Sequence, residues 1–293
     1  MEAKLYAALY KLVSSLAHPR RKRCRFNDRI IVMVYLWSVL FDRPVCWACD
    51  QDNWFGNDDF ELPSDTTMSR RLRTPSVLQL IERALAAGSE LFGPAPLLKQ
   101  MDSKPMYVGP YTKDKDAKSG RVAQGKMACG YRLHTLNHGR NVKFFQIAPM
   151  SEHDSAVAPA LLDHLEGGGY VAADNAYDNN DLHKKSADKN HQLVAPARAC
   201  NKGVRDTKYN CPQRLRALDM LDSPLEKCGL EPKFGKELYN GRQPVESGYG
   251  GLTMQGLHYL PAWARGPRRV ALWAAGKILI SLIRNAKKKG LAA

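Results

Sequence analysis

Leu97-Leu-Lys-Gln-Met-Asp102-Ser-Lys-Pro105 is a segment that predicts a strand, with the carboxylate of Asp102 delivered just before a turn. Three further apolar segments of strand length follow it along the chain, at 130–136, 142–147 and 170–174. Asn-His-Gly-Arg-Asn joins the first two of these, and this composition is typical of a hairpin. A helix over 154–165, ended by three consecutive glycines, precedes the strand that finishes at Asp174.

The pattern continues with a helix, a strand and a closing apolar helix over about 178–189, 191–195 and 268–289. This order of strands and helices predicts an α/β domain over residues 96–290, with a mixed sheet flanked by helices. Residues 109–126 are rich in Gly, Lys and Asp and predict a loop. Residues 198–238 predict an insertion, because Cys, Pro and charged residues interrupt the pattern there.

Residues 1–95 differ in character and predict an all-helical region. Asn27 or Asp28 is a natural N-cap for a helix over 30–41, and Ser64 or Asp65 is one for a later short helix. That short helix carries Arg70, Arg71 and Arg73. Short helices in tandem, with an Arg-rich one in the middle, predict a helix-turn-helix-like DNA-binding region that uses these arginines. The alternative is a small helical bundle with a solvated basic face.

The charge of the chain favours a polyanionic partner. The 44 Lys and Arg residues outnumber 29 Asp and Glu and give a formal net charge of +15, which favours nucleic acid over a membrane surface. The longest apolar run, 30–41, is shorter than the ~20 residues that span a bilayer. Seven scattered cysteines are typical of a reduced cytoplasmic protein. Packing is the default role of Cys46 and Cys49, with metal or redox use as the alternative.

Asp102, Asp174 and Glu246 form the candidate catalytic set. Carboxylates at the strand ends of a mixed sheet gather at one edge, where open α/β sheets place their sites. Three converging oxygen donors would suit two Mg²⁺ ions, and such a pair stabilises the attacking and leaving oxygens of a displacement at phosphorus. Each carboxylate taken alone is better explained as an ordinary surface residue.

The segment Tyr239-Asn-Gly-Arg-Gln-Pro-Val-Glu246 carries the third carboxylate together with a positively charged arginine, Arg242. A helix through it would place Tyr239, Arg242 and Glu246 on one face, because four and seven residues are helical spacings. Arg242 would hold the carboxylate ionised, and a guanidinium can also grip a phosphate. The alternative is an exposed helix with an ordinary Arg–Glu pair.

Taken together, these residues resemble the DDE transposases of bacterial insertion sequences, over roughly residues 60–260. Asp102 matches the first catalytic Asp of that family. The segment Ala173-Asp-Asn-Ala-Tyr-Asp178 is similar to the family's D-x-G-Y-D segment around the second catalytic Asp, here Asp174. Ala176 stands in place of the usual Gly.

The third part of the resemblance is the family's Y-R-E-K signature. Its first three positions match Tyr239, Arg242 and Glu246. Thr253 stands where the Lys of the signature is expected. Two shorter segments also resemble family motifs, Lys126–His134 a G-Y-K-L-H strand and His153-Asp154 a short H-D element.

The resemblance implies a ribonuclease H-like catalytic domain and a DNA transposase. Asp102, Asp174 and Glu246 would be the catalytic residues and the ligands of Mg²⁺, with Mn²⁺ as a substitute. Water would first free a 3′-hydroxyl at the transposon end, and that hydroxyl would then attack target DNA. Tyr239 and Arg242 would bind phosphate next to the scissile bond.

The resemblance also implies double-stranded DNA as the partner, both transposon ends and target. It implies a homodimer that holds two ends together, in the bacterial cytoplasm at the nucleoid. Two alternatives stay open. Thr253 favours a DNA-binding regulator with weakened catalysis, whereas a metal-dependent nuclease of the same fold would cut DNA without strand transfer.

Overall fold

The computed structural model describes residues 2–19, 24–54, 61–122, 125–198, 203, 205–222 and 234–292. The chain forms two compact units, one of Met1–Gly93, Gln255–Leu257 and Arg268–Ala293, the other of Pro94–Met254 and His258–Pro267. The division after Gly93 lies close to the domain boundary expected at residue 95. The closing helix groups with the N-terminal helices, however, whereas the sequence placed it in the α/β domain 96–290.

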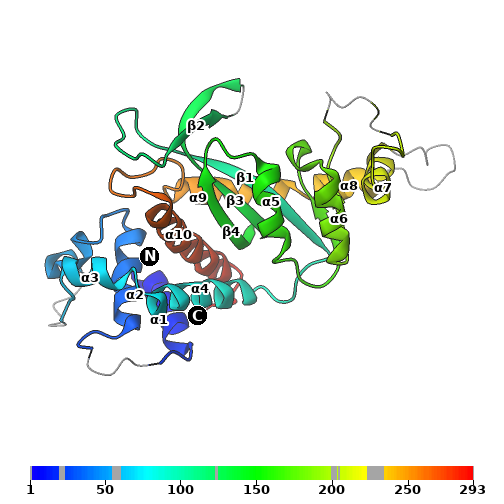
Figure 1. Ribbon diagram of the computed structural model, residues 1–293. Helices are drawn as coiled ribbons and strands as arrows, with labels where there is room; N and C mark the ends of the chain where they lie inside the picture. Colours follow the sequence, from blue (N-terminus) through cyan, green and yellow to red (C-terminus); the bar gives the residue numbers. More distant parts are fainter. Residues whose placement is uncertain are drawn as a thin grey trace. The chain divides into compact units, whose positions relative to one another are not determined.

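The second unit is built around a mixed sheet (Figure 1). Its strands within the described residues are β1 (Leu98–Tyr107), β2 (Lys118–Arg121), β3 (Met127–His138), β4 (Asn141–Pro149), β5 (Gly169–Ala172) and β6 (His191–Val194). The strand order is β2-β3-β1-β5-β6, and β4 also pairs with β3, along residues 131–138, whereas β2 pairs with residues 127–130. β3 is antiparallel to β1 and β4, whereas β5 is parallel to β1 and β6. The predicted fold class, a ribonuclease H-like mixed sheet flanked by helices after a helical N-terminal region, is confirmed.

The two faces of β1 have different neighbours. Successive side chains of a strand point to opposite faces, so Met101 and Ser103 share one face and Gln100, Asp102 and Lys104 share the other. Met101 belongs to the apolar core that the helices α5 (Asp154–Leu162) and α6 (Asn180–Asp188) form with the sheet. The opposite face of β1 contacts α9 (Gln243–Met254) instead. The chemistry-bearing side chains of β1 therefore point towards a late segment of the chain.

Two predictions about this sheet are wrong. The chain does not turn after Asp102, because β1 continues to Tyr107 and stays paired with β3 along this length. β5 is paired with β1 only as far as Gln100, and a proline is tolerated in a strand where one edge has no partner. Part of the predicted loop 109–126 also forms a strand, β2, which pairs with the start of β3.

The predicted insertion 198–238 contains α7 (Pro212–Asp222) and the first part of α8 (Phe234–Asn240). Residues 199–202, 204 and 223–233 of that prediction lie outside the described residues. α7 packs against α6, α8 and β6, so this part of the insertion belongs to the sheet unit. The range predicted as an insertion thus contains helical structure that lies beside α6 (Figure 1).

The helical unit contains α1 (Glu2–Ser15), α2 (Asp28–Leu40), α3 (Asp65–Arg71), α4 (Pro75–Glu90) and α10 (Pro267–Lys288). The caps follow the sequence, because Asn27 accepts the N–H of Ile30 and Ser64 accepts that of Thr67. α10 lies close against α2, since a Cβ on Gly276 would come within 3.0 Å of Val39. No helix in the described part of the chain is long and apolar enough to cross a membrane.

Candidate active site

Asp102 lies on β1, and Asp174 lies at the same level just after the end of the neighbouring parallel strand β5. Gln100 in β1 is the register partner of Ala172 in β5, and each aspartate comes two residues after one of these partners. The Oδ1 atom of each aspartate accepts a backbone N–H from the residues that follow it, at 2.8 Å for Asp102 and 2.9 Å for Asp174. The structure therefore brings the two predicted aspartates together and fixes their carboxylates locally.

Burial makes ionisation of the Asp102 and Asp174 carboxyl groups less favourable. Desolvation raises the pKa of Asp102 to about 6, although the positive charge of Arg242 acts in the opposite direction. Desolvation also raises the pKa of Asp174, and Asp154 adds to this effect. A cation close to two desolvated carboxylates favours their charged forms. This edge of the sheet is therefore suited to binding positive charge.

Arg242 supplies that positive charge in the structure. Its Nη1 donates to Oδ2 of Asp102 at 2.8 Å, and its Nη2 donates to Oε1 of Glu246 at 3.2 Å. The guanidinium carbon also lies 5.9 Å from the centroid of the Tyr239 ring, within reach of a cation–π contact. Arg242 thus connects three of the predicted site residues through one side chain.

The single helix predicted through Tyr239 and Glu246 is wrong. α8 ends at Asn240 and α9 begins at Gln243, so Arg242 lies in the short connection between two helices. Pro244 in the first turn of α9 accounts for the break, because a proline has no backbone N–H to donate to the carbonyl oxygen four residues earlier and is tolerated only in the first turn of a helix. The Arg242–Glu246 pair survives the break, since its four-residue spacing spans the first turn of α9.

Close packing holds this connection against β1. The Nε2 of Gln100 donates to the carbonyl oxygen of Gly241 at 3.0 Å. A Cβ on Gly241 would lie 2.3 Å from Cδ2 of Leu98, so any other residue here would require the Leu98 side chain to shift. Further along α9, a Cβ on Gly248 would lie 2.7 Å from the carbonyl oxygen of Arg140. These contacts set the position of Arg242 over Asp102.

The carboxylates fit a divalent cation in chemistry, but they do not form a complete cage. The Asp102 side chain is 14% exposed and that of Glu246 is 64% exposed. Among the described residues, no three His, Cys, Asp or Glu side chains are close enough to hold a metal ion together. A cation, the Arg242 guanidinium, already lies between Asp102 and Glu246, and both offer the hard oxygen donors that Mg²⁺ prefers.

Asp154 is a further carboxylate beside the site that the sequence prediction did not include. Its Oδ2 accepts from Nη1 of Arg132 at 2.9 Å, and its Oδ1 lies 3.3 Å from Nδ1 of the buried His134. Burial opposes ionisation, but hydrogen bonds from His134 and Ser103 outweigh it and lower the pKa of Asp154. The motifs Lys126–His134 and His153-Asp154 carry these residues, yet their spacing alone does not show that they meet.

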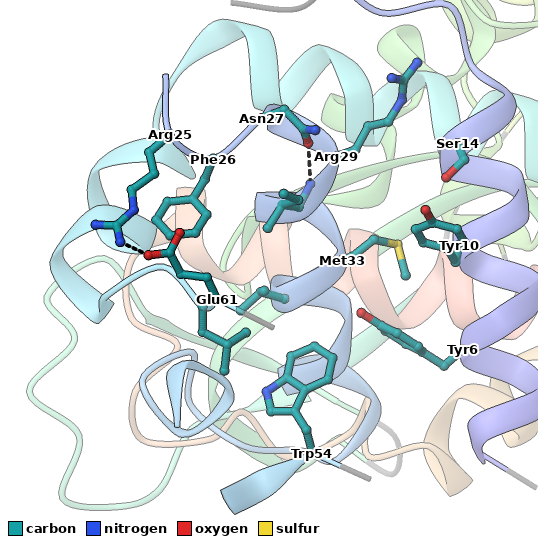
Figure 2. Close-up of a pocket in the computed structure, with 13 residues that line it drawn as sticks. Tyr6, Tyr10, Ser14, Arg25, Phe26, Asn27, Arg29, Met33, Trp54 and Glu61 are labelled. Atoms are coloured by element: carbon teal, nitrogen blue, oxygen red, sulfur yellow. Dashed lines mark hydrogen bonds and ion pairs between the residues drawn. The ribbon is translucent and has the colours of Figure 1, made fainter. Parts of the chain in front are cut away.

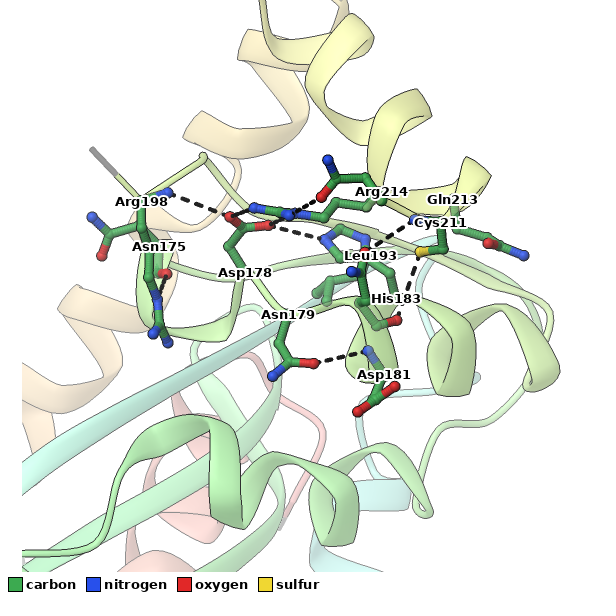
Figure 3. Close-up of polar contacts among 12 residues, drawn as sticks. Asn175, Asp178, Asn179, Asp181, His183, Leu193, Arg198, Cys211, Gln213 and Arg214 are labelled. Atoms are coloured by element: carbon green, nitrogen blue, oxygen red, sulfur yellow. Dashed lines mark hydrogen bonds and ion pairs between the residues drawn. The ribbon is translucent and has the colours of Figure 1, made fainter. Parts of the chain in front are cut away.

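The segment that follows Asp174 is fixed by a buried ion pair (Figure 3). Arg214 of α7 donates from Nε and Nη2 to the two oxygens of Asp178, at 2.7 and 2.5 Å. His183 of α6 lies 3.5 Å from the same carboxylate, and the backbone N–H of Arg198 donates to it at 3.3 Å. Burial opposes ionisation, but hydrogen bonds from His183 and Arg214 lower the pKa of Asp178 to about 2.

The arginines predicted for DNA binding in the helical unit have different environments. Arg70 and Arg73 are exposed. Arg71 is buried, and its guanidinium donates to the carbonyl oxygen of Phe26 at 3.0 Å and to Oδ1 of Asp28 at 2.5 Å. The expectation that Arg71 binds DNA is therefore corrected, because a side chain with these internal partners serves the fold. The DNA-binding role of Arg70 and Arg73 stays a prediction.

The helical unit also contains a cavity of about 760 Å³ (Figure 2). Aromatic and basic side chains line it, including Tyr6, Tyr10, Trp54, Arg25 and Arg29. Arg25 is paired with Glu61 at its rim, as Figure 2 shows. None of the predicted catalytic residues lines this cavity.

The order and direction of the strands define the class of fold as ribonuclease H-like. Within this class, the sequence matches the family described as transposase DDE domain over residues 98–283, and the chain belongs to that family. A cryo-EM structure of the piggyBac transposase in a synaptic complex with hairpin DNA is similar at 10% sequence identity, with a TM-score of 0.47. The similarity covers 98% of this chain and 74% of the piggyBac chain. No curated protein matches the sequence.

Proposed function

We propose that the chain is a DNA transposase that cleaves at transposon ends and joins the freed ends to target DNA. The observation that carries the proposal is the pair Asp102 on β1 and Asp174 just after β5, level with each other, with Arg242 bonded to Asp102. Membership of the transposase DDE domain family supports the same conclusion. The net charge of +15 fits a polyanionic substrate.

Asp102 and Asp174 would hold divalent metal, with Mg²⁺ as the natural ion, Mn²⁺ as a substitute and Glu246 as the completing ligand. Bound there, Mg²⁺ would stabilise charge on the attacking and leaving oxygens at phosphorus. Arg242 would move from Asp102 to a DNA phosphate, which its planar guanidinium binds through two parallel hydrogen bonds. The Tyr239 ring, 5.9 Å from that guanidinium, would keep it oriented during the exchange.

The partner in this proposal is double-stranded DNA, held by a homodimer with one transposon end for each protomer. Arg70 and Arg73 of the helical unit would contact the end sequence, since both are exposed. Phosphate contacts make such binding strongly dependent on salt. The proposed complex should therefore weaken steeply between low and moderate ionic strength.

A product analysis tests the function and separates it from its alternatives. The full chain is incubated with Mg²⁺ and labelled DNA that carries the inverted repeats flanking the gene, together with a supercoiled target plasmid. The proposal predicts end cleavage and joined products. Cleavage without joining would identify a nuclease of the same fold. A bound complex without cleavage would identify a regulator.

A further inference from the structure

Lys104 is a buried lysine on the same face of β1 as Asp102. Its side chain follows Asp102 by two residues, the spacing at which strand residues share a face, and the residue is only 8% exposed. It comes from the strand that carries the first candidate catalytic residue. A buried ammonium in this position needs a partner that offsets the loss of water.

Within the described residues, the partner of Lys104 is a neutral hydroxyl. Its Nζ donates to Oγ1 of Thr253 at 2.7 Å, and no described carboxylate lies within ion-pair distance of it. Of the two other buried lysines in the described part of the chain, Lys277 is paired with Asp42, whereas Lys99 donates to the carbonyl oxygen of Gly168. Buried lysines are ordinarily paired with an anion, so the charge of Lys104 is incompletely compensated by the chain itself.

Thr253 is arranged to hold this ammonium. Its hydroxyl donates to the carbonyl oxygen of Tyr249 at 2.8 Å, which leaves the oxygen lone pairs free to accept from Lys104. Thr253 is exposed near the end of α9 and follows Glu246 by seven residues, about two helical turns. The lysine therefore reaches from β1 to the solvent-facing side of the helix that also carries Glu246.

We propose that Lys104 binds a backbone phosphate of the DNA substrate, with Thr253 as the positioning residue that holds its ammonium ready. A phosphate supplies the anionic partner that the described chain does not, and it lies beside Asp102 in any substrate that reaches the site. The inference rests on the proposed function. It also accounts for the absence of a lysine at position 253. Lys104 of β1 places its positive charge at Thr253, where the lysine of the Y-R-E-K signature would otherwise stand on α9.

Salt-dependent binding of the full chain to end DNA tests the proposal. Lys104→Met should weaken binding at low salt by about tenfold, the scale of one charged hydrogen bond. It should also lower the slope of log affinity against log salt by ~0.9, the value for one phosphate contact. Lys104→Arg should keep the slope of the wild type. Lys104→Met combined with Thr253→Lys should restore it, because the cation returns to the same place.

Lys99→Met is the matched control. Lys99 is another buried lysine of β1, but it lies on the opposite face and donates to the carbonyl oxygen of Gly168 at 2.7 Å. Its loss should change the melting temperature without changing the salt slope. Equal slopes for folded Lys104→Met and wild type would overturn the proposal.

A second variant keeps the test decisive if Lys104→Met does not fold. Thr253→Glu changes an exposed position and gives Lys104 an internal counter-ion, so it should raise the melting temperature and lower the salt slope by at least one contact. Thr253→Gln is its neutral control. An unchanged slope in Thr253→Glu would place Lys104 away from DNA. Absence of Mg²⁺-dependent cleavage by the wild type would instead refute the transposase function.

Discussion

At the scale of single residues, Arg242 is the side chain that links the parts of the site. It is bonded to Asp102 and to Glu246 and would have to exchange the first of these contacts for a phosphate. Arg242→Ala should therefore reduce end cleavage by about 100-fold, or ~3 kcal/mol of transition-state stabilisation. Arg242→Lys should restore little of it, because an ammonium cannot form the two parallel bonds.

Arg216→Ala is the matched control for this prediction, since Arg216 is exposed on α7 and its loss removes the same charge. Single-turnover cleavage of a pre-cut and an intact end would be measured for each variant. Equal rates for Arg242→Ala and Arg216→Ala would show that Arg242 contributes only bulk charge.

The residue types at this site were predictable from the sequence, but their contacts were not. The spacing of Arg242 and Glu246 gives their i,i+4 pair directly. The contact of Arg242 with Asp102 joins residues 140 positions apart, and no local pattern carries that information. The burial of Arg71 was not predictable for the same reason, because its partner Asp28 lies 43 residues earlier.

At the scale of secondary-structure elements, the Asp178–Arg214 pair fastens α7 to the segment that follows Asp174. Both side chains are nearly fully buried, at 0% and 8% exposure. The folded-state pKa of Asp178 is about 2, below its ordinary value of 3.8, so the pair stabilises the fold above pH 4. This contribution, about 2 kcal/mol, should be lost as the pH falls from 4 to 2.

Asp178→Asn should accordingly lower the free energy of unfolding by about 3 kcal/mol at pH 7, because it leaves the Arg214 guanidinium buried without an anion. Denaturant unfolding between pH 2 and 7 measures this. The exposed Arg205–Asp219 pair is the control, and Asp219→Asn should cost less than about 1 kcal/mol. A difference between wild type and Asp178→Asn that does not shrink below pH 4 would contradict the electrostatic explanation.

A second prediction at this scale concerns the arginines of α3 and of the turn that follows it. Arg70→Ala and Arg73→Ala should each weaken binding to end DNA while leaving the melting temperature within about 2 °C of the wild type. Arg71→Ala should instead lower the melting temperature by several degrees, because it removes a buried partner of Asp28. Thermal unfolding and DNA titration of the three full-length variants distinguish these roles. Equal behaviour of all three would contradict the assignment.

At the scale of the whole molecule, local patterns predicted the elements better than their grouping. The helix caps at Asn27 and Ser64 and the hairpin of β3 and β4 follow from short-range signals. The grouping of α10 with the N-terminal helices does not, because its apolar residues fit a helix on either unit. Its partners are α2 and α4, and Leu279 of α10, for example, meets Gly88 of α4 from far along the chain.

The central claim is that Asp102 and Asp174 together carry metal-dependent cleavage of DNA. The most direct measurement is the rate of Mg²⁺-dependent end cleavage by the wild type, Asp102→Asn and Asp174→Asn, with DNA binding measured in parallel. Both variants should bind end DNA nearly as the wild type does. Their cleavage rate should fall at least 1,000-fold, because each loses several kcal/mol of transition-state stabilisation. Retention of a tenth of wild-type cleavage by either variant would contradict the claim.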